Sequence, residues 1–340
     1  MREAGFLFIL LIFFLLLFFF GYAVISELRK WFATFSGSRK QATLPTLVVG
    51  NLTVGGSGKT PFVQFLSDKL QNNAVLLRGY RRKTKGVLEV TSNHNVQDVG
   101  DEAMEHFQEG LKVFVGENRL EAVEKIHQID RNIELVILDD GLQHVPLEPH
   151  CGLLLTDYQS PFWKEKFAIP FGKLRQFRSS AQDFDAWVIT KCPRDISQDK
   201  MDQIRSKTEL PLYFASYKTS EPKQCNGSSV EINGGMKLGL ITGIVNGRRL
   251  RRTLENRDLN IVRHWEYSDH YLFRREDLSR WISESKKEGI GAWICSRKDF
   301  MRMGAWYLPD VAIFEVHTEV EILNSEEEIL LNFIKSKTQK

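Results

Sequence analysis

The sequence predicts an α/β protein with a mainly parallel sheet, helices on both faces of that sheet, and a second, smaller α/β domain. Two observations carry this prediction. Short apolar runs alternate with helical stretches along most of the chain, and the runs are almost continuous in Val, Ile and Leu. Strands of that composition are buried on both faces, as in parallel sheets covered by helices. A third observation, an apolar N-terminus, predicts a membrane helix ahead of the two domains.

The elements of the first domain follow in a regular order. Strands are expected at 45–51, 74–79, 112–116, 133–141, 151–158 and 185–192, and helices at 59–71, 99–110 and 117–129. The segment 211–237 has turn residues and weak alternation, which indicates a ribbon or linker. We expect a membrane-anchoring helix and linker over 1–40, a nucleotide-binding domain over 41–215, a linker or ribbon over 216–236, and a smaller α/β domain over 237–340.

The smaller domain repeats the alternation. Strands are expected at 238–246, 259–265, 292–296 and 310–316, and helices from about Arg248, at 274–289 and at 325–337. The last helix is amphipathic and is expected to close this domain.

Composition narrows the class of protein. A chain of 340 residues is long for one core, and Lys plus Arg (46) exceeds Asp plus Glu (43) only slightly. The chain is therefore not generally polycationic, and no nucleic-acid partner is expected. Basic residues cluster at 78–86 and 247–252, which suits a membrane surface, a phosphorylated ligand or simply solvent. Four scattered cysteines form no metal or disulfide pattern and indicate a reducing compartment.

The N-terminus predicts a membrane anchor. From Ala4 to Ile25 the sequence has no charged residue, and about 22 apolar residues are enough to cross a bilayer. The run is longer than the apolar part of a usual signal peptide and lacks a clear cleavage site. Basic residues follow the run, so the rest of the chain is expected in the cytoplasm. An apolar stripe through Trp31 and Phe35 leaves open whether the helix spans the bilayer or lies in one leaflet.

A glycine-rich turn links the first predicted strand and helix. In GNLTVGGSGKTP, the strand ends at Gly50 and the helix opens with Lys59 and Thr60. This is the arrangement in which backbone N–H groups and a helix N-terminus hold phosphates, Lys reaches the terminal phosphates and the Thr hydroxyl binds Mg²⁺. The sheet is thus predicted to be P-loop NTPase-like. The predicted phosphate-binding residues are Thr53, Val54, Gly55, Gly56, Ser57, Gly58, Lys59 and Thr60.

Acidic and basic residues at other strand ends complete the predicted site. Asp139 and Asp140 end an apolar strand, and both are candidates to hold magnesium. Asp101 and Glu102 lie near a helix start, where capping is the ordinary role. His270 follows Asp269 in the second domain, and a lone histidine is more often packed or solvated than catalytic. In ITKCP, Pro193 stands where a base-reading Asp would be needed, which disfavours a GTPase.

These motifs together resemble the tetraacyldisaccharide 4'-kinase family of lipid A biosynthesis. The resemblance rests on GNLTVGGSGKTP, RGYRRK, GDE, DDGLQH, PFGKLRQF, GIVNGRR, SDHY and SRKD, and so covers nearly the whole chain, with the apolar N-terminus matching the family's membrane helix. It also accounts for Thr53, which stands where a standard phosphate loop has its first glycine. Three departures, Gln176, Gly247 and Tyr271, concern substrate contacts and not the loop.

The resemblance implies an ATP-dependent lipid kinase. The γ-phosphate of ATP is transferred to the 4'-hydroxyl of a tetraacyldisaccharide 1-phosphate on the cytoplasmic face of the inner membrane. The implied partners are this glycolipid and the membrane, with no obligate protein partner. Asp101 and His270 are implied to deprotonate the sugar hydroxyl, with Lys59 at the phosphates. Glu102 is implied to join Thr60, Asp139 and Asp140 at Mg²⁺. The substrate-binding residues implied are Arg78, Tyr80, His144 and Arg175.

Two other classes of protein remain as alternatives on sequence grounds. A membrane-tethered P-loop ATPase or GTPase could act as a switch on a protein partner, and its hydrolysis would not depend on His270. A binding protein with a glycine turn and no catalysis would leave Lys59 and the Asp139–Asp140 pair without a role. Neither alternative explains the GDE and SDHY motifs.

Overall fold

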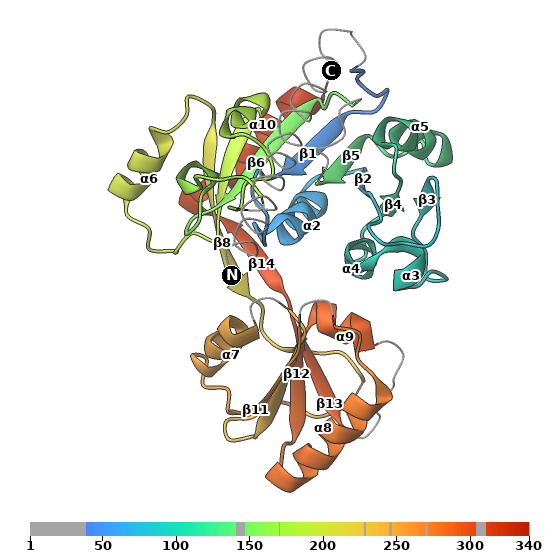
Figure 1. Cartoon of the computed structure of the whole chain (residues 1–340), viewed down its shortest axis with the longest axis vertical. Coiled ribbons are helices and arrows are strands. Elements are labelled where there is room, and N and C mark those ends of the chain that lie inside the picture. Colours follow the sequence, from blue (N-terminus) through green and yellow to red (C-terminus); the bar gives the residue numbers. More distant parts are fainter. Residues whose placement is uncertain are drawn as a thin grey trace, which may run out of the picture. The chain divides into compact units, whose positions relative to one another are not determined.

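The structure is a computed structural model that describes residues 39–140, 147–169, 171–227, 229–244, 247–268, 271–303 and 311–339. These residues form two compact units (Figure 1). Unit 1 comprises the described residues of Met1–Tyr217 and Val320–Lys340, and unit 2 comprises those of Lys218–Glu319. Each unit is built on its own sheet.

Unit 1 contains a nine-stranded sheet in the order β14-β8-β7-β6-β1-β5-β2-β4-β3. Neighbours from β8 to β4 pair in parallel, and β3 pairs with β4 in the antiparallel sense. The strands are β1 Thr46–Gly50, β2 Asn73–Leu77, β3 Leu88–Glu89, β4 Val113–Val115, β5 Leu135–Asp139, β6 Cys151–Asp157, β7 Ala186–Thr190, β8 Leu212–Thr219 and β14 Thr318–Ile322. The predicted parallel-rich α/β fold is confirmed.

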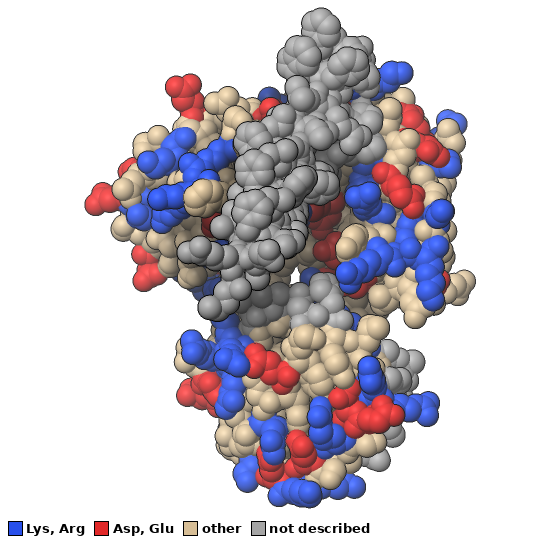
Figure 2. All heavy atoms as spheres, in the orientation of Figure 1, with Lys and Arg blue, Asp and Glu red and all other residues tan. Residues whose placement is uncertain are grey.

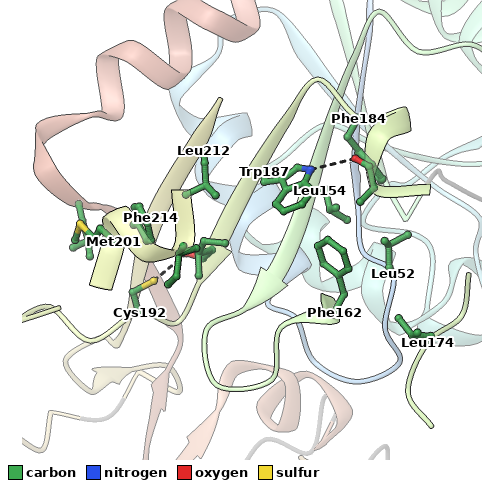
Figure 3. Packing of buried hydrophobic residues seen from close by; sticks show 14 residues of the cluster. Leu52, Leu154, Phe162, Leu174, Phe184, Trp187, Cys192, Met201, Leu212 and Phe214 are labelled. Atoms are coloured by element: carbon green, nitrogen blue, oxygen red, sulfur yellow. Dashed lines mark hydrogen bonds between the residues drawn. The ribbon is translucent and has the colours of Figure 1, made fainter. Parts of the chain in front are cut away.

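The helices of unit 1 cover this sheet. They are α2 Lys59–Lys69, α3 Val96–Val99, α4 Asp101–Gln108, α5 Arg119–Ile129, α6 Gln198–Arg205 and α10 Glu327–Thr338, with 3-10 turns η2 Phe162–Lys164, η3 Arg178–Asp183 and η4 Leu323–Ser325. Every residue of β1, β5 and β7 is buried, so both faces of these strands are covered. One part of the core is shown in Figure 3, where Phe162 and Trp187 pack with Leu154 and Leu52.

Strand β1 lies where the direction of the chain across the sheet changes. After β1 the chain builds β2, β3 and β4 on the β5 side, and it later builds β6, β7 and β8 on the other side. Ligands of open parallel sheets bind at such switch points, beyond the carboxyl ends of the strands. The loop after β1 therefore occupies the position that the fold favours for a ligand.

The C-terminal helix differs from the prediction. It is present as α10, but it belongs to unit 1, where it contacts β1 and β6, and does not close the smaller domain. Its buried face is formed by Leu330, Ile334 and Thr338. Amphipathic spacing shows that a helix buries one face, but it does not show which sheet receives that face.

The predicted linker over 216–236 also differs. Its first residues extend β8, and Lys223–Gln224 form β9, an edge strand antiparallel to β13 in the second sheet. The segment was expected to be a ribbon because its apolar alternation is weak. Backbone pairing makes residues 216–219 and 223–224 strand nonetheless, while the described residues from 225 to 236 carry no strand.

Unit 2 contains a five-stranded sheet in the order β11-β10-β12-β13-β9. Its elements are β9, β10 Leu238–Thr242, α7 Gly247–Glu255, β11 Ile261–Glu266, α8 Arg275–Glu288, β12 Ala292–Ser296, α9 Arg297–Met303 and β13 Ala312–Val316. The four longer strands are parallel, and two apolar clusters, one around Leu240 and one around Trp281, form its core. This is the second α/β set that the sequence predicted.

The predicted membrane helix lies within residues 1–38, outside the described residues. Among the helices that the structure describes, none combines the length and the apolar character needed to cross a membrane.

Candidate functional site

The glycine-rich turn lies between β1 and α2, as predicted. Gly55 and Gly58 have φ values of +109° and +80°, a region that glycine adopts at little cost. The N–H of Phe62 already donates to the Gly58 carbonyl at 3.3 Å, so α2 begins directly behind the turn. The exposed N–H groups of a helix start and of the preceding turn form an anion-binding surface.

Three consecutive carbonyls of the turn are held by side chains from the end of β7, from the residue after it and from β8. Lys191 Nζ donates to the Gly56 carbonyl, Thr190 Oγ1 to the Ser57 carbonyl at 2.8 Å, and Tyr217 Oη to the Gly58 carbonyl at 2.8 Å. Burial raises the pKa of Tyr217 well above its ordinary value, so its hydroxyl stays protonated and able to donate. None of the three contacts was predicted from the sequence, although ITKCP contains Thr190 and Lys191.

Lys191 is itself held by an acidic partner. Its Nζ lies 2.8 Å from Asp157 Oδ2, at the end of β6. Burial acts to raise the pKa of the Asp157 carboxyl, but the hydrogen bond and charge of Lys191, together with hydrogen bonds from the backbone N–H groups of Gln159 and Ser160, outweigh it, and the pKa is lowered below its ordinary value. The strand ends of β6, β7 and β8 thus support the turn from one side.

Lys59 and Asp140 lie together, as the phosphate-loop prediction requires. Lys59 Nζ donates to Asn51 Oδ1 at 3.0 Å and lies 4.0 Å from Asp140 Oδ2. Arg175 donates to the same Asp140 oxygen at 2.9 Å. Asp140 has a φ of +57° and directly follows Asp139, the last residue of β5. Two cations therefore meet one carboxylate beside the turn.

Asp139 is paired with a residue that the sequence analysis did not select. Its Oδ2 lies 3.1 Å from His106 Nε2, and both side chains are buried. His106 is on α4, whose first residues are Asp101 and Glu102. The buried pair therefore fixes the helix that carries the GDE motif against the end of β5. No spacing in the sequence links His106 to Asp139, which lies 33 residues further along the chain.

Basic residues gather near this edge of the sheet. Figure 2 shows Lys and Arg side chains beside α3 and α4. Arg78 and Tyr80 are exposed at the start of the loop after β2. Arg119 is buried, and burial lowers its pKa to about 10; the charge of Arg78 acts in the same direction, while Asp140 and Asp139 oppose it. The positive charge of this region is therefore concentrated near the strand ends that hold the acidic pair.

Several predicted residues are not brought into a described cluster. His144 and His270 lie outside the described residues. Glu102 and Asp101 share the start of α4, where Asp101 Oδ1 accepts from the Glu102 N–H at 3.1 Å. Among the described residues, no group of three or more His, Cys, Asp or Glu side chains is arranged to hold a metal ion. The roles of these residues stay predictions.

A central parallel strand, a glycine turn, a helix opening with Lys-Thr and an acidic neighbouring strand end define a P-loop nucleoside-triphosphate-binding protein. A sequence model of the tetraacyldisaccharide-1-P 4'-kinase family matches residues 11–338. The chain is 33% identical to the tetraacyldisaccharide 4'-kinase of Cytophaga hutchinsonii, over 94% of this chain and 95% of the relative, and 28% identical to that of Flavobacterium psychrophilum, over 93% and 95%.

A solved structure agrees with this assignment at the level of the fold. It is described as an "apo" form of LpxK from Aquifex aeolicus in complex with ATP, and its TM-score to this chain is 0.70 at 23% identity, covering 94% of this chain and 99% of the other. The extent of the family match decides the assignment. The chain belongs to the tetraacyldisaccharide-1-P 4'-kinase family.

Proposed function

We propose that the chain transfers the γ-phosphate of ATP to the 4'-hydroxyl of a tetraacyldisaccharide 1-phosphate in lipid A biosynthesis. Family membership supports the reaction, and the observation that carries the site is the placement of Lys59 beside Asp140, between the glycine turn and Arg175. Phosphoryl transfer depends mostly on positioning and on neutralising charge, and these residues supply both. Family membership also favours the kinase over the alternative of a P-loop switch.

The turn holds the triphosphate in this proposal. Its carbonyls are bonded from outside by Lys191, Thr190 and Tyr217, which fixes the backbone of the turn in the shape that receives the phosphates. The buried Ser57 hydroxyl has no partner within the described chain, which suits a group awaiting a phosphate oxygen. Lys59 neutralises the terminal phosphates, and Arg78 and Arg175 are the proposed contacts to the anionic glycolipid, together with Tyr80 and His144.

Magnesium fits the same residues. Mg²⁺ keeps several waters and takes one or two protein ligands with the phosphates, so a large cluster of carboxylates is not needed. Thr60 opens α2, and Asp139 and Asp140 end the adjacent strand β5. We propose that Thr60 and this acidic pair hold the ion, with Glu102 nearby. The bound ion would neutralise charge on the transferred phosphate.

The acceptor hydroxyl needs a base. We propose that Asp101 and His270 act as a pair that removes its proton as the new bond forms, because a sugar hydroxyl is a weak nucleophile at neutral pH. We place the reaction on the cytoplasmic face of the inner membrane, where the apolar segment from Ala4 to Ile25 anchors the chain.

The test is transfer of labelled γ-phosphate from ATP to tetraacyldisaccharide 1-phosphate in detergent micelles. Wild type should label the lipid, whereas Asp101→Asn and His270→Ala should each lose at least about a hundredfold in kcat while still binding ATP. Asp68→Asn and His94→Ala are matched controls at positions outside the proposed site. ATP hydrolysis by the wild type without lipid labelling would refute the kinase.

A further inference from the structure

Two exposed phenylalanines lie on the connection between η2 and η3. Phe167 is 62% exposed and Phe171 is 51% exposed. We name residues 165–169 and 171–174 the phenylalanine loop. An aromatic ring in water leaves most of its apolar surface uncompensated, and two such rings on one short loop form a patch that suits another apolar phase.

The backbone of this loop is tightly closed. The N–H of Ile169 donates to the Leu174 carbonyl at 2.9 Å, and the N–H of Leu174 donates to the Phe167 carbonyl at 3.3 Å. A Cβ on Gly172 would lie 2.6 Å from the carbonyl carbon of Phe167, so only glycine fits there. The loop is therefore a defined structure that holds its phenylalanines outward.

Positive charge surrounds the two rings. Lys164, Lys166 and Lys173 are all exposed, and the acidic residue among them is Glu165, which lies 3.8 Å from Lys173 at the surface. Apolar aromatic side chains bracketed by lysines are typical of segments that enter the headgroup layer of an anionic bilayer. A protein partner would need an apolar patch edged with acid, whereas an anionic bilayer supplies both features to any such loop.

The base of the loop is joined to the phosphate-binding turn. The N–H of Val54 donates to the Lys173 carbonyl at 2.7 Å, and the N–H of Arg175 donates to the Leu52 carbonyl at 2.8 Å. Leu174 is buried in the same apolar cluster as Leu52 (Figure 3). The side chain of Arg175 then reaches Asp140. The phenylalanine loop is thus connected to the phosphate-binding turn through a few hydrogen-bonded residues.

We propose that Phe167 and Phe171 insert into the headgroup and upper acyl region of an anionic bilayer, as a membrane contact separate from the N-terminal segment. This inference rests on the proposed function, which puts the chain at a membrane with a lipid substrate. The inserted loop fixes the orientation of the phosphate-binding turn toward the bilayer surface, where the sugar hydroxyl of the substrate lies. The three lysines hold the loop at anionic headgroups.

Quenching by brominated lipid tests insertion directly. The full chain carrying Phe167→Trp is reconstituted in vesicles of phosphatidylethanolamine and phosphatidylglycerol, with and without bromine on the acyl chains. The fluorescence added by the new tryptophan should be quenched by brominated lipid. Ile329→Trp is the matched control, because Ile329 is 59% exposed on α10, away from the loop, and its added fluorescence should be unaffected. If brominated lipid does not quench the fluorescence added at position 167, the side chain does not enter the bilayer. That result overturns the proposal, even if the ring is covered in some other way.

Kinetics give a second test. Phe167→Ser with Phe171→Ser should raise the KM for lipid, expressed as surface mole fraction, by about tenfold and leave the KM for ATP unchanged. Phe167→Leu with Phe171→Leu should restore it. The pair Ile129→Ser and Ile329→Ser removes comparably exposed apolar side chains elsewhere and should match wild type. An unchanged lipid KM in the serine pair contradicts the proposal.

The two proposals fail separately. Lipid quenching requires no catalysis, so quenching without lipid phosphorylation would refute the proposed function and leave the membrane contact standing. Phosphorylation with an unquenched tryptophan at position 167 would do the reverse.

Discussion

Tyr217 and Gly58 are matched in both shape and hydrogen bonding. The Tyr217 hydroxyl donates to the Gly58 carbonyl at 2.8 Å, and the tyrosine ring lies where a Cβ on residue 58 would be, 2.9 Å from Tyr217 Cζ. Gly58 also has a φ of +80°. The last glycine of the turn is therefore required for two reasons: its backbone has a positive φ, and the Tyr217 ring from β8 leaves no room for a Cβ.

The first prediction concerns Gly58→Ala. The left-handed backbone and the overlap with the Tyr217 ring should together lower the free energy of unfolding by about 2 kcal/mol or more. Gly56→Ala is the matched control, because no atom of the described residues, apart from its chain neighbours, lies within 4 Å of a Cβ built there and its φ is not positive. Thermal unfolding of both variants without nucleotide is the measurement. Equal losses from the two substitutions would contradict the explanation.

The second prediction concerns the Tyr217 hydroxyl alone. Tyr217→Phe keeps the ring but removes the hydrogen bond that orients the Gly58 carbonyl. A hydrogen bond of this kind contributes about 0.5 to 1.5 kcal/mol, so the KM for ATP should rise by about two- to tenfold. Steady-state kinetics at saturating lipid measure it.

Tyr213→Phe is the control for that prediction. Tyr213 lies on the same strand and packs near Phe333, away from the turn. Its loss of a hydroxyl should leave the KM for ATP at the wild-type value. If the KM for ATP of Tyr217→Phe is no higher than that of Tyr213→Phe, the Tyr217 hydroxyl does not contribute to ATP binding.

The local parts of the fold could be predicted from the sequence. Near-continuous Val, Ile and Leu runs located β1, β5 and β7, because strands buried on both faces need apolar side chains on both. The glycine turn was predicted because several glycines lie between an apolar strand and a helix that opens with Lys59 and Thr60. Both signals are contained within a few consecutive residues.

The supporting contacts could not be predicted in the same way. Thr190, Lys191 and Tyr217 reach the turn from more than a hundred residues away in the chain, and nothing in ITKCP or in β8 states which backbone they will meet. His106 was passed over because a histidine inside an amphipathic helix is ordinary. Its meaning depends on Asp139, which only the folded sheet brings to it.

The third prediction concerns the His106–Asp139 pair. His106→Ala leaves a buried carboxylate with one partner fewer, which should cost about 1 to 3 kcal/mol of unfolding free energy. Because the pair also fixes α4, kcat for phosphoryl transfer should fall as well. His94→Ala is the control, since the His94 ring contacts Thr91 within its own turn and lies outside the proposed site.

A double-mutant cycle separates the pair from the helix in that prediction. If the two side chains stabilise each other, the double variant His106→Ala with Asp139→Asn should lose less unfolding free energy than the sum of the losses in the two single variants. Additive losses would show that the two residues act independently and that their 3.1 Å approach contributes little.

The last prediction is a pH dependence set by Asp157. Its carboxyl pKa is lowered below the ordinary value of 3.8, because Lys191 and the backbone N–H groups of Gln159 and Ser160 together outweigh the opposing effect of burial. A lowered pKa in the folded state means that the unfolded chain binds the proton more readily. The stabilisation that the Asp157 carboxylate contributes is therefore complete above its ordinary pKa. It is lost as the pH falls through the pKa of the folded state. Asp157→Asn should lose about 1 to 2 kcal/mol at pH 7 and should change less than wild type between about pH 5 and pH 3.

Thermal unfolding across this pH range measures that difference. Asp195→Asn is the control, because Asp195 is exposed on the connection that follows β7. It should follow the wild-type curve. Since Lys191 also holds the Gly56 carbonyl, the loss of Asp157 should loosen the turn and raise the KM for ATP at pH 7. A parallel pair of stability curves for wild type and Asp157→Asn would show that the Asp157 carboxylate contributes no pH-dependent stability, and Lys191 would then support the turn without help from its acidic partner.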